Sequence, residues 1–238
     1  RRFLEAFVRK VSLAKLALDQ KPLDEYQHRE LKNLIMQRMK GMPLQYLTGN
    51  QSFYGRDFYI NMNVFIPRFE TEQLVEYALK QLPHPSDLER MNVLEFGTGS
   101  GCIAITLALE SPDLFITATE YLPAAISVAE ENAQKFKVGN IDFLHVSDTP
   151  MLVQYEQLPL FDMIISNPPY LLESDEISPE VHNHEPYEAL YSHTNDGLSF
   201  YRFLAELVHT KLKHNGIAVF ELAAERAQAT TGVFNHCG

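Results

Sequence analysis

The sequence Asn167-Pro168-Pro169-Tyr170 combines residue types that could hold a planar nitrogen group. It follows an apolar run at 161–166, which is typical of a buried strand, and the two prolines prevent that strand from continuing. The Asn167 side chain offers a carbonyl acceptor, and the Pro168 carbonyl has no competing N–H. Tyr170 adds an aromatic wall. The motif favours a receptor for an amide or an exocyclic amine that is to be alkylated, although a simple turn after a strand has the same features.

A glycine cluster, Gly97-Thr98-Gly99-Ser100-Gly101, connects a predicted strand at 92–96 to a predicted helix at 102–110. Glycines let the backbone turn tightly and approach a ligand, and the first N–H groups of the helix lack intrahelical partners. The cluster lacks the Gly-Lys-Ser/Thr sequence of a phosphate-binding Walker loop. Glu120 ends the next predicted strand, where a carboxylate can hold the hydroxyls of a ribose. A ribose-containing ligand is therefore favoured over a tight turn without a ligand.

Two further groups of polar residues could form ligand sites. Asp148 follows the third predicted strand and is expected near an adenine bound in the same crevice, although Asp is also common in turns. His182, His184 and Glu185 lack a further ligand at a suitable spacing, so no metal site is expected. They belong to a long acidic stretch at 171–196, and long loops in compact domains are usually functional or disordered. We expect a solvated lid there.

The order of predicted elements indicates an α/β fold. Strands are predicted at 92–96, 114–119, 141–146, 161–166 and 217–222, and helices at 102–110, 123–137 and 198–213. Strands that alternate with helices of this length indicate right-handed crossovers and a Rossmann-like, doubly wound, mostly parallel sheet. Ligands of such sheets bind outside the carboxyl ends of the strands. Both the glycine cluster and Asn167 fall at these ends.

The residues before this domain predict two smaller parts. Residues 1–43 are expected to form a helical module, with an amphipathic helix at 1–18 and a second helix that begins after the N-cap Asp24. Residues 44–72 read as a hairpin linker with short strands near 53–54, 58–60 and 64–66, and Thr71 is expected to cap the next helix. The α/β domain then spans 73–238. Because two helices bury little surface, the module is expected to pack on a larger body or on further helices that are missing from a truncated N-terminus.

Composition restricts the function classes. The net charge of −11 argues against a broad phosphate-binding surface and favours a protein partner over nucleic acid. No apolar run is long enough to span a bilayer, so no membrane association is expected. Cys102 and Cys237 provide no disulfide framework, which suggests a reducing compartment. The cytoplasm is expected, with the mitochondrial matrix as the alternative if a targeting segment preceded Arg1.

Taken together, these motifs resemble the class I S-adenosylmethionine-dependent methyltransferases that modify planar nitrogens. Within that class, the chain resembles the PrmC/HemK family, the protein-glutamine methyltransferases of class 1 peptide-chain release factors. Beyond the motifs above, the resemblance covers several further segments, which are Gln45-Tyr46-Leu47-Thr48-Gly49, Ile66-Pro67-Arg68, Thr71-Glu72, Val93 to Phe96, Glu185-Pro186 and Ala189-Leu190. Asn-Pro-Pro-Tyr is shared with adenine methyltransferases, so the Ile-Pro-Arg segment and the helical module are what point to release factors.

The resemblance implies methyl transfer from S-adenosylmethionine to the glutamine side-chain amide of a Gly-Gly-Gln loop. The segment Gly97 to Gly101 would hold the methionine moiety, Glu120 the ribose, and Asp148 with Thr149 the adenine edge. Asn167 and Pro168 would accept the amide N–H groups, with Pro169 and Tyr170 completing the site. The N-terminal helices would bind the release factor, and a monomer is expected. A ribosomal-protein glutamine, a nucleic-acid adenine and a non-catalytic cofactor-binding role remain as alternatives.

The chain departs from the family pattern at several positions. Glu95 and Glu120 stand where Asp is common, Thr149 stands where an aromatic residue often flanks the adenine, and Phe69 replaces a proline. The family's sheet ends with a further antiparallel hairpin after the fifth strand. We therefore expect a methyltransferase domain that is truncated at its C-terminus.

Overall fold

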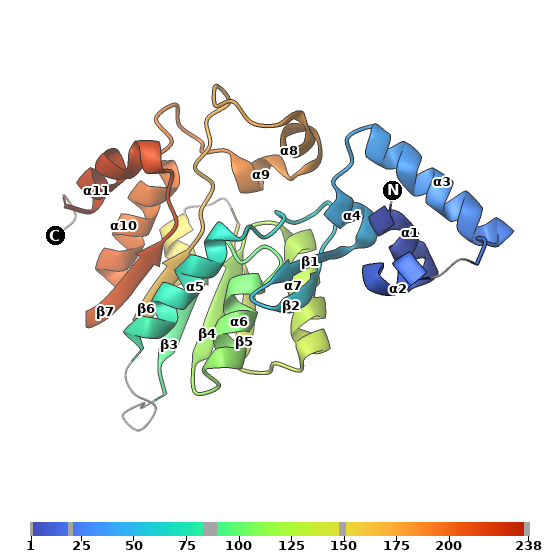
Figure 1. Cartoon of the computed structure of the whole chain (residues 1–238). Helices are drawn as coiled ribbons and strands as arrows, with labels where there is room; N and C mark the ends of the chain where they lie inside the picture. Colours follow the sequence, from blue (N-terminus) through green and yellow to red (C-terminus); the bar gives the residue numbers. More distant parts are fainter. Residues whose placement is uncertain (1, 19–20, 83–89, 148–150, 236–238) are drawn as a thin grey trace.

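A parallel sheet forms the centre of the molecule (Figure 1). The computed structural model describes residues 2–18, 21–82, 90–147 and 151–235. The strands are β3 (Asn92–Phe96), β4 (Phe115–Glu120), β5 (Ile141–His145), β6 (Phe161–Ser166) and β7 (Leu212–Phe220), and they lie in the order β5-β4-β3-β6-β7. Every neighbouring pair is parallel. The predicted doubly wound α/β fold is therefore confirmed.

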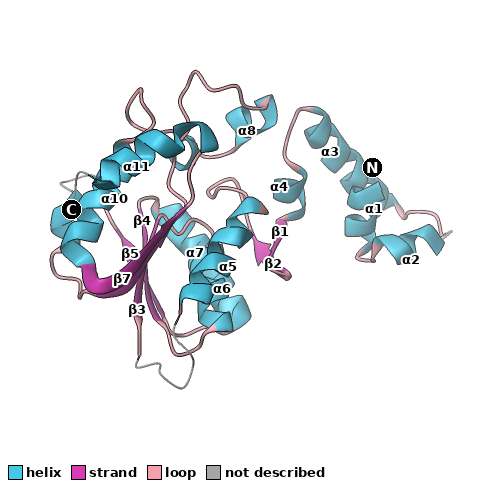
Figure 2. Cartoon of the chain, turned by 60° about the vertical axis from the view of Figure 1, so that its left-hand side comes forward, coloured by secondary structure: helices cyan, strands magenta, loops and turns pink. Residues whose placement is uncertain are grey.

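Helices cover both faces of this sheet (Figure 2). One face packs against α5 (Glu70–Gln81), α6 (Cys102–Glu110) and α7 (Pro123–Phe136). The other face packs against α10 (Ser199–Lys211), α11 (Ala227–Asn235) and the 3-10 helix η2 (Met151–Tyr155). Strand residues alternate between the two cores, as with Val93 on the first face and Leu94 on the second. Burial on both faces explains why the strands are almost continuously apolar.

The last strand and the residues after it differ from the prediction. β7 begins at Leu212 rather than at Ile217, and its pairing with β6 shifts register between Phe161 and Met163. This irregularity brings residues just after α10 into the sheet, where the sequence pattern had indicated the end of a helix. Within the described residues, β7 is followed by the 3-10 helix η3 (Ala224–Arg226) and by α11. The family's further hairpin is not among them.

The N-terminal residues form α1 (Arg2–Arg9), α2 (Leu13–Leu18) and α3 (Glu25–Met39). The predicted single helix at 1–18 is wrong, because the backbone of Lys10 is left-handed, with a φ of 54°, and separates α1 from α2. The predicted cap of α3 is confirmed: Asp24 Oδ1 accepts the Gln27 N–H at 2.8 Å, and the Gln27 side chain accepts the Asp24 N–H. Buried Leu4, Val8 and Leu31 join α1 to α3.

The segment between these helices and the sheet contains the predicted hairpin and two deviations from expectation. After α4 (Leu44–Thr48), the strands β1 (Asn50–Phe53) and β2 (Arg56–Tyr59) pair antiparallel. Residues 64–66 form no strand, although Val64 and Ile66 are buried against α7. Thr71 does not cap α5, since it lies within the first turn of that helix. None of the helices in the described ranges is long and apolar enough to cross a membrane.

Asn132 on α7 connects this hairpin to the glycine loop. Its carboxamide is buried, accepts the Tyr59 N–H at 2.8 Å, and donates to the Tyr59 carbonyl at 2.8 Å and to the Ser100 carbonyl at 2.9 Å. Three backbone groups therefore depend on one side chain. Such a role has no local sequence signature, because Tyr59 and Asn132 are far apart in the chain.

We predict that Asn132→Ala lowers the free energy of unfolding by about 2–4 kcal/mol, because buried backbone groups lose their partners. Urea denaturation followed by circular dichroism measures this change. Gln134→Ala on the exposed face of the same helix is the control, with an expected change within about 0.5 kcal/mol. Equal midpoints for wild type and Asn132→Ala would contradict the assigned role.

Candidate active site

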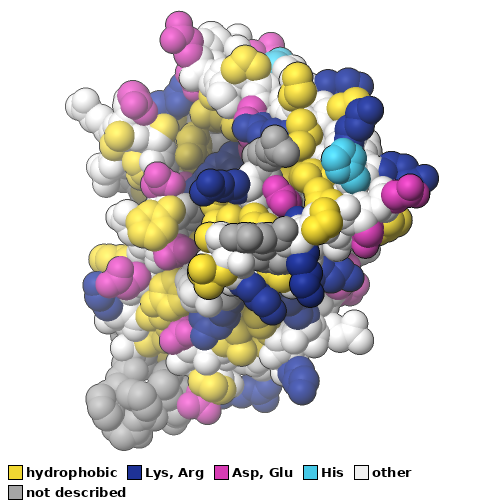
Figure 3. All heavy atoms as spheres, turned by 45° about the vertical axis from the view of Figure 1, so that its right-hand side comes forward, with side chains coloured by type: hydrophobic (Ala, Val, Ile, Leu, Met, Phe, Trp, Pro, Cys, Tyr) yellow, Lys and Arg dark blue, Asp and Glu magenta, His cyan; other side chains and the backbone are white. Residues whose placement is uncertain are grey.

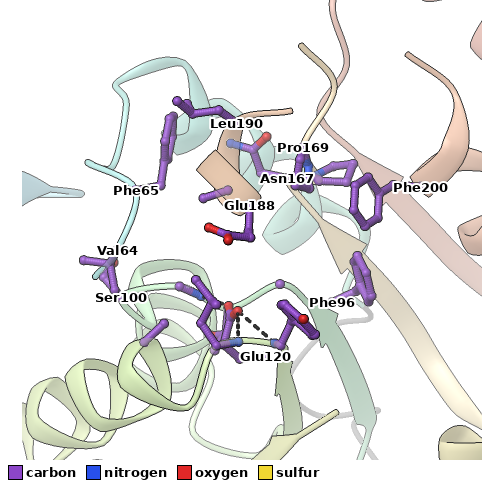
Figure 4. A pocket seen from close by; sticks show the side chains of 18 of the residues that line it. Val64, Phe65, Phe96, Ser100, Glu120, Asn167, Pro169, Glu188, Leu190 and Phe200 are labelled. Atoms are coloured by element: carbon purple, nitrogen blue, oxygen red, sulfur yellow. Dashed lines mark hydrogen bonds between the residues drawn. The ribbon is translucent and has the colours of Figure 1, made fainter. Parts of the chain in front are cut away.

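A cavity of about 680 Å³ lies at the carboxyl ends of β3, β4 and β6. Parallel pairing brings these ends to one edge of the sheet, since Phe96 lies opposite both Thr119 and Ser166. The cavity is lined by the glycine loop, by Glu120 and by residues 167–170, together with residues from the linker and the lid. In Figure 4, Asn167 lies on one side of the cavity, Glu120 lies on the other, and Glu188 points into the space between them. The structure therefore brings together most of the predicted site residues.

The glycine loop has the open surface that a ligand requires. Gly97 and Gly99 have positive φ angles of 73° and 54°, and a Cβ at either position would meet no atom within 4 Å. A side chain there would project into open space along the cavity wall. Gly101 is needed for a different reason, since its Cβ would approach the Ala129 Cα on α7 to 3.3 Å. Two glycines thus leave room for a ligand, and the third permits close packing of α6 against α7.

The Glu120 carboxylate is held in place by backbone N–H groups of the glycine loop and of the residues that follow β4. Its Oε2 accepts the Gly99 N–H at 2.8 Å, and its Oε1 accepts the N–H groups of Tyr121 at 2.8 Å and Leu122 at 3.0 Å. Burial raises the pKa of Glu120, and these backbone donors oppose the rise. The carboxylate lines the cavity and is fixed before any ligand binds.

Glu95 lies beneath the glycine loop, outside the cavity lining. It is fully buried, and its Oε2 accepts the Thr98 hydroxyl at 2.6 Å. Burial raises the pKa of Glu95 to about 8. Its uncharged form therefore dominates at neutral pH, which reduces the free energy needed to bury it. Through its contact with Thr98, Glu95 helps to hold the conformation of the glycine loop.

At the Asn167 corner, Asn167 and Pro168 line the cavity, and each has a carbonyl oxygen that can accept hydrogen bonds. The Asn167 Nδ2 donates to the Thr71 hydroxyl at 3.1 Å. Within the described part of the chain, no group donates a hydrogen bond to the Asn167 Oδ1 or to the Pro168 carbonyl. Pro168, Pro169 and Tyr170 also line the cavity, and burial raises the pKa of the Tyr170 hydroxyl. This arrangement suits a ligand that donates hydrogen bonds.

The lid contains two short helices, α8 (Pro179–His184) and α9 (Tyr187–Leu190), where the sequence had indicated a solvated loop. The buried carboxylate of Glu185 ties the lid to the linker. Its Oε2 accepts the Ile66 N–H at 3.0 Å, and its Oε1 pairs with Arg68. Arg38 on α3 also contacts the lid, through an ion pair of 2.8 Å with Glu180. The lid is therefore attached both to the linker and to the N-terminal helices.

Several cavity residues escaped the sequence reasoning. Thr71, Glu188, Phe65, Phe96 and Phe200 line the cavity. Their types give no signal of a site, and only the fold brings them together. Glu188 belongs to the acidic stretch at 171–196, and nothing in its spacing indicates a place in the cavity. Asp148 and Thr149, predicted to contact an adenine, lie outside the described residues, although the preceding Val146 and Ser147 line the cavity.

Two family models match the chain. A model described as the PrmC N-terminal domain matches residues 2–49. A model described as the methyltransferase small domain matches residues 72–183. The first match covers the N-terminal helices, and the second covers the glycine loop and the Asn167 corner.

Whole-chain relatives agree with these matches. A release factor glutamine methyltransferase of Flavobacterium psychrophilum is 40% identical over 224 residues, which cover 92% of this chain and 76% of the relative. One of Geobacter sulfurreducens is 36% identical over 220 residues, covering 92% and 74%. A solved methyltransferase of Pyrococcus furiosus shares the fold, with a TM-score of 0.52 at 16% identity over 87% of this chain and 84% of that chain. The chain therefore belongs to the release factor glutamine methyltransferase family.

Proposed function

We propose that this protein methylates the side-chain amide nitrogen of the glutamine in the Gly-Gly-Gln motif of a class 1 peptide-chain release factor. The observation that carries the proposal is that Asn167 and Pro168, which both have acceptor oxygens, line the same cavity as the glycine loop and Glu120. The names of the relatives support the same reaction. The methyl donor is S-adenosylmethionine.

The residues present fit this cofactor. Open space beside Gly97 and Gly99 leaves room for the methionine moiety, and the preorganised Glu120 carboxylate can accept hydrogen bonds from ribose hydroxyls. The cavity volume lies within the usual range for small-molecule sites. When bound, S-adenosylmethionine supplies an electrophilic methyl group on a sulfonium. We retain Asp148 and Thr149 as proposed contacts of the adenine edge.

The Asn167 corner would act on the substrate amide. An amide nitrogen is a weak nucleophile because its lone pair is delocalised into the carbonyl. The Asn167 Oδ1 and the Pro168 carbonyl would accept its two N–H groups, orient it, and stabilise the positive charge that develops on it. Tyr170 would pack against the amide plane. The nitrogen becomes acidic only as the new C–N bond forms, so its proton is lost late.

The N-terminal helices are proposed to bind the protein substrate. Ten of the 20 Lys and Arg residues lie in residues 1–43, compared with five of the 31 Asp and Glu residues. Figure 3 shows hydrophobic side chains interspersed with Lys and Arg side chains on the face that this view turns forward. Met36 and Met39 of α3 are 49% and 82% exposed. Exposed apolar residues that are surrounded by charged residues are suited to binding the surface of a partner protein.

The alternatives concern the target. A ribosomal-protein glutamine would use the same chemistry, whereas an adenine in nucleic acid conflicts with the net charge of −11. A non-catalytic role would require a bound cofactor without transfer. An assay of methyl transfer from labelled cofactor distinguishes these functions. Its acceptors are a purified release factor, a ribosomal protein and a DNA or RNA duplex, and a non-catalytic protein labels none of them. We propose a monomer that acts where translation terminates, in the cytoplasm or the mitochondrial matrix.

We predict that Asn167→Ala reduces kcat at least about 100-fold while cofactor affinity stays within about tenfold, because the lost acceptor acts mainly in the transition state. Labelled methyl transfer and calorimetry measure the two quantities. Asn140→Ala, at the opposite end of the sheet, is the matched control. Full activity of Asn167→Ala would remove this residue from the mechanism.

We predict that Glu120→Ala weakens S-adenosylmethionine binding by about 1.5–3 kcal/mol, because charge-assisted hydrogen bonds to the ribose are lost. Calorimetry measures the affinity. Glu110→Ala, which removes an exposed carboxylate of α6 that pairs with Arg56, should leave it unchanged. An unchanged affinity in Glu120→Ala would mean that the ribose is held elsewhere.

We predict that replacing both Met36 and Met39 with Ser raises KM for the intact release factor roughly tenfold and leaves KM for a short Gly-Gly-Gln peptide unchanged, because the peptide does not reach α3. Steady-state kinetics with both substrates measures the difference. Leu160→Ser, which alters a residue that is 51% exposed just before β6, is the control. An equal rise for both substrates would argue against docking on α3.

A further inference from the structure

The two ends of the Asn167 carboxamide are not equivalent for the proposed reaction. The substrate amide offers N–H donors, so the Asn167 Oδ1 must face it. A flipped carboxamide would present its own NH2 group, and two donors would then oppose each other. A carboxamide can flip unless its surroundings distinguish oxygen from nitrogen. A group that contacts the Asn167 carboxamide must therefore fix its orientation.

Thr71 contacts the Asn167 carboxamide directly. It is buried in the first turn of α5, and its Oγ1 accepts a hydrogen bond from the Asn167 Nδ2 at 3.1 Å. A hydroxyl by itself does not select an orientation, because it can donate as well as accept. The selection depends on where the Thr71 proton goes.

Glu221 is a neighbour of both Thr71 and Asn167. Ser166 pairs in parallel with Phe220, and the Glu221 N–H donates to the Ser166 carbonyl at 3.0 Å. Asn167 directly follows β6 and Glu221 directly follows β7, so these two residues lie side by side at the edge of the sheet where the strands end. Burial raises the pKa of Glu221, and the Thr71 hydroxyl and the Asn167 carboxamide are among the neighbours that oppose this rise. Its buried Oε2 has no hydrogen-bond partner within the described chain.

A carboxylate distinguishes the two ends of the carboxamide. In its ionised form, Glu221 offers only acceptor atoms, so it attracts the Thr71 proton and the Asn167 NH2 group and repels the Asn167 Oδ1. With its proton directed toward Glu221, Thr71 has a lone pair left for the Asn167 Nδ2. Both contacts then favour the same orientation, with the NH2 group inward and the Oδ1 toward the cavity.

We propose that Thr71 and Glu221 are positioning residues that hold the Asn167 carboxamide with its oxygen facing the substrate nitrogen. This inference rests on the proposed function, since an amide or amine acceptor is what requires an oxygen at that point. It differs from a purely structural role, in which the two residues would only join α5 to β7. A structural role predicts a loss of stability, whereas the positioning role predicts a loss of kcat in a folded, cofactor-binding enzyme.

The first test compares Thr71→Val with Thr71→Ser. Thr71→Val keeps the shape and removes the hydroxyl, and kcat for methylation of the intact release factor should fall about tenfold or more, with KM and cofactor affinity within about twofold. Thr71→Ser restores the hydroxyl and should restore most of kcat. Thr106→Val is the control, because this buried hydroxyl on α6 has no hydrogen-bond partner within the described chain. Its kcat should equal that of the wild type.

The second test uses Glu221→Gln, which keeps the size of the side chain but can present an N–H group to Asn167. Its kcat should fall about tenfold, and combining it with Thr71→Val should lower kcat little further, because both changes release the same carboxamide. The side-chain amide protons of Asn167, assigned in ¹⁵N-labelled protein through their absence in Asn167→Ala, should exchange faster with solvent in both variants. This readout does not depend on activity.

The outcomes separate the two proposals. If the wild type does not methylate the release factor, the proposed function fails, whatever the variants do. If the wild type is active and Thr71→Val keeps its full kcat, the positioning role is wrong. The same conclusion follows if every loss of kcat is matched by a loss of cofactor affinity or thermal stability, or if the two substitutions act multiplicatively.

Discussion

The parallel pairing of β3 with both of its neighbours is the constraint on which the site depends. Because Phe96 lies opposite Thr119 on β4 and Ser166 on β6, all three strands end at one edge of the sheet. Backbone pairing of these strands therefore brings the glycine loop, Glu120 and Asn167 around one space. A slip of one residue between β3 and β6 would turn the side chains of one strand to the wrong face. The helices on both faces oppose such a slip, since it would disrupt the packing of both apolar cores.

Buried carboxylates hold the segments around this edge. Glu120 binds three backbone N–H groups from the glycine loop and the β4 end, and Glu185 binds a backbone N–H and an arginine of the linker. Burying a carboxylate is unfavourable unless donors surround it. Each of these groups therefore stabilises one particular arrangement of the segments that it joins. The cavity walls consequently depend on these polar contacts as well as on apolar packing such as that of Val64 and Ile66 against α7.

The parts of this structure that follow from local pattern could be predicted from the sequence. Apolar runs and their spacing indicated the strands, and glycines, prolines and Glu120 at strand ends indicated the ligand edge. The remaining parts depend on contacts between distant residues. Lys10 interrupts a helical pattern that continues on both sides of it. Residues 64–66 have the composition of a strand but no strand to pair with. In the sequence, Asn132 resembles any polar helix residue and Glu185 resembles any acidic residue of the lid. Their roles depend on Tyr59 and Ile66, which only the fold brings into contact with them.

Two acceptor atoms at the Asn167 corner also bear on how many methyl groups one nitrogen can receive. Under the proposed reaction, the amide is held by both of its N–H groups, one at the Asn167 Oδ1 and one at the Pro168 carbonyl. After one transfer the nitrogen keeps a single N–H, and its methyl group would have to face a carbonyl oxygen to which it cannot donate a conventional hydrogen bond. The monomethylated amide would therefore leave one of the two acceptors unpaired if it were bound for a second transfer, and the second transfer itself would leave both unpaired. Under the proposed reaction, the arrangement that favours a primary amide as substrate would thus also disfavour transfer beyond the monomethylated product.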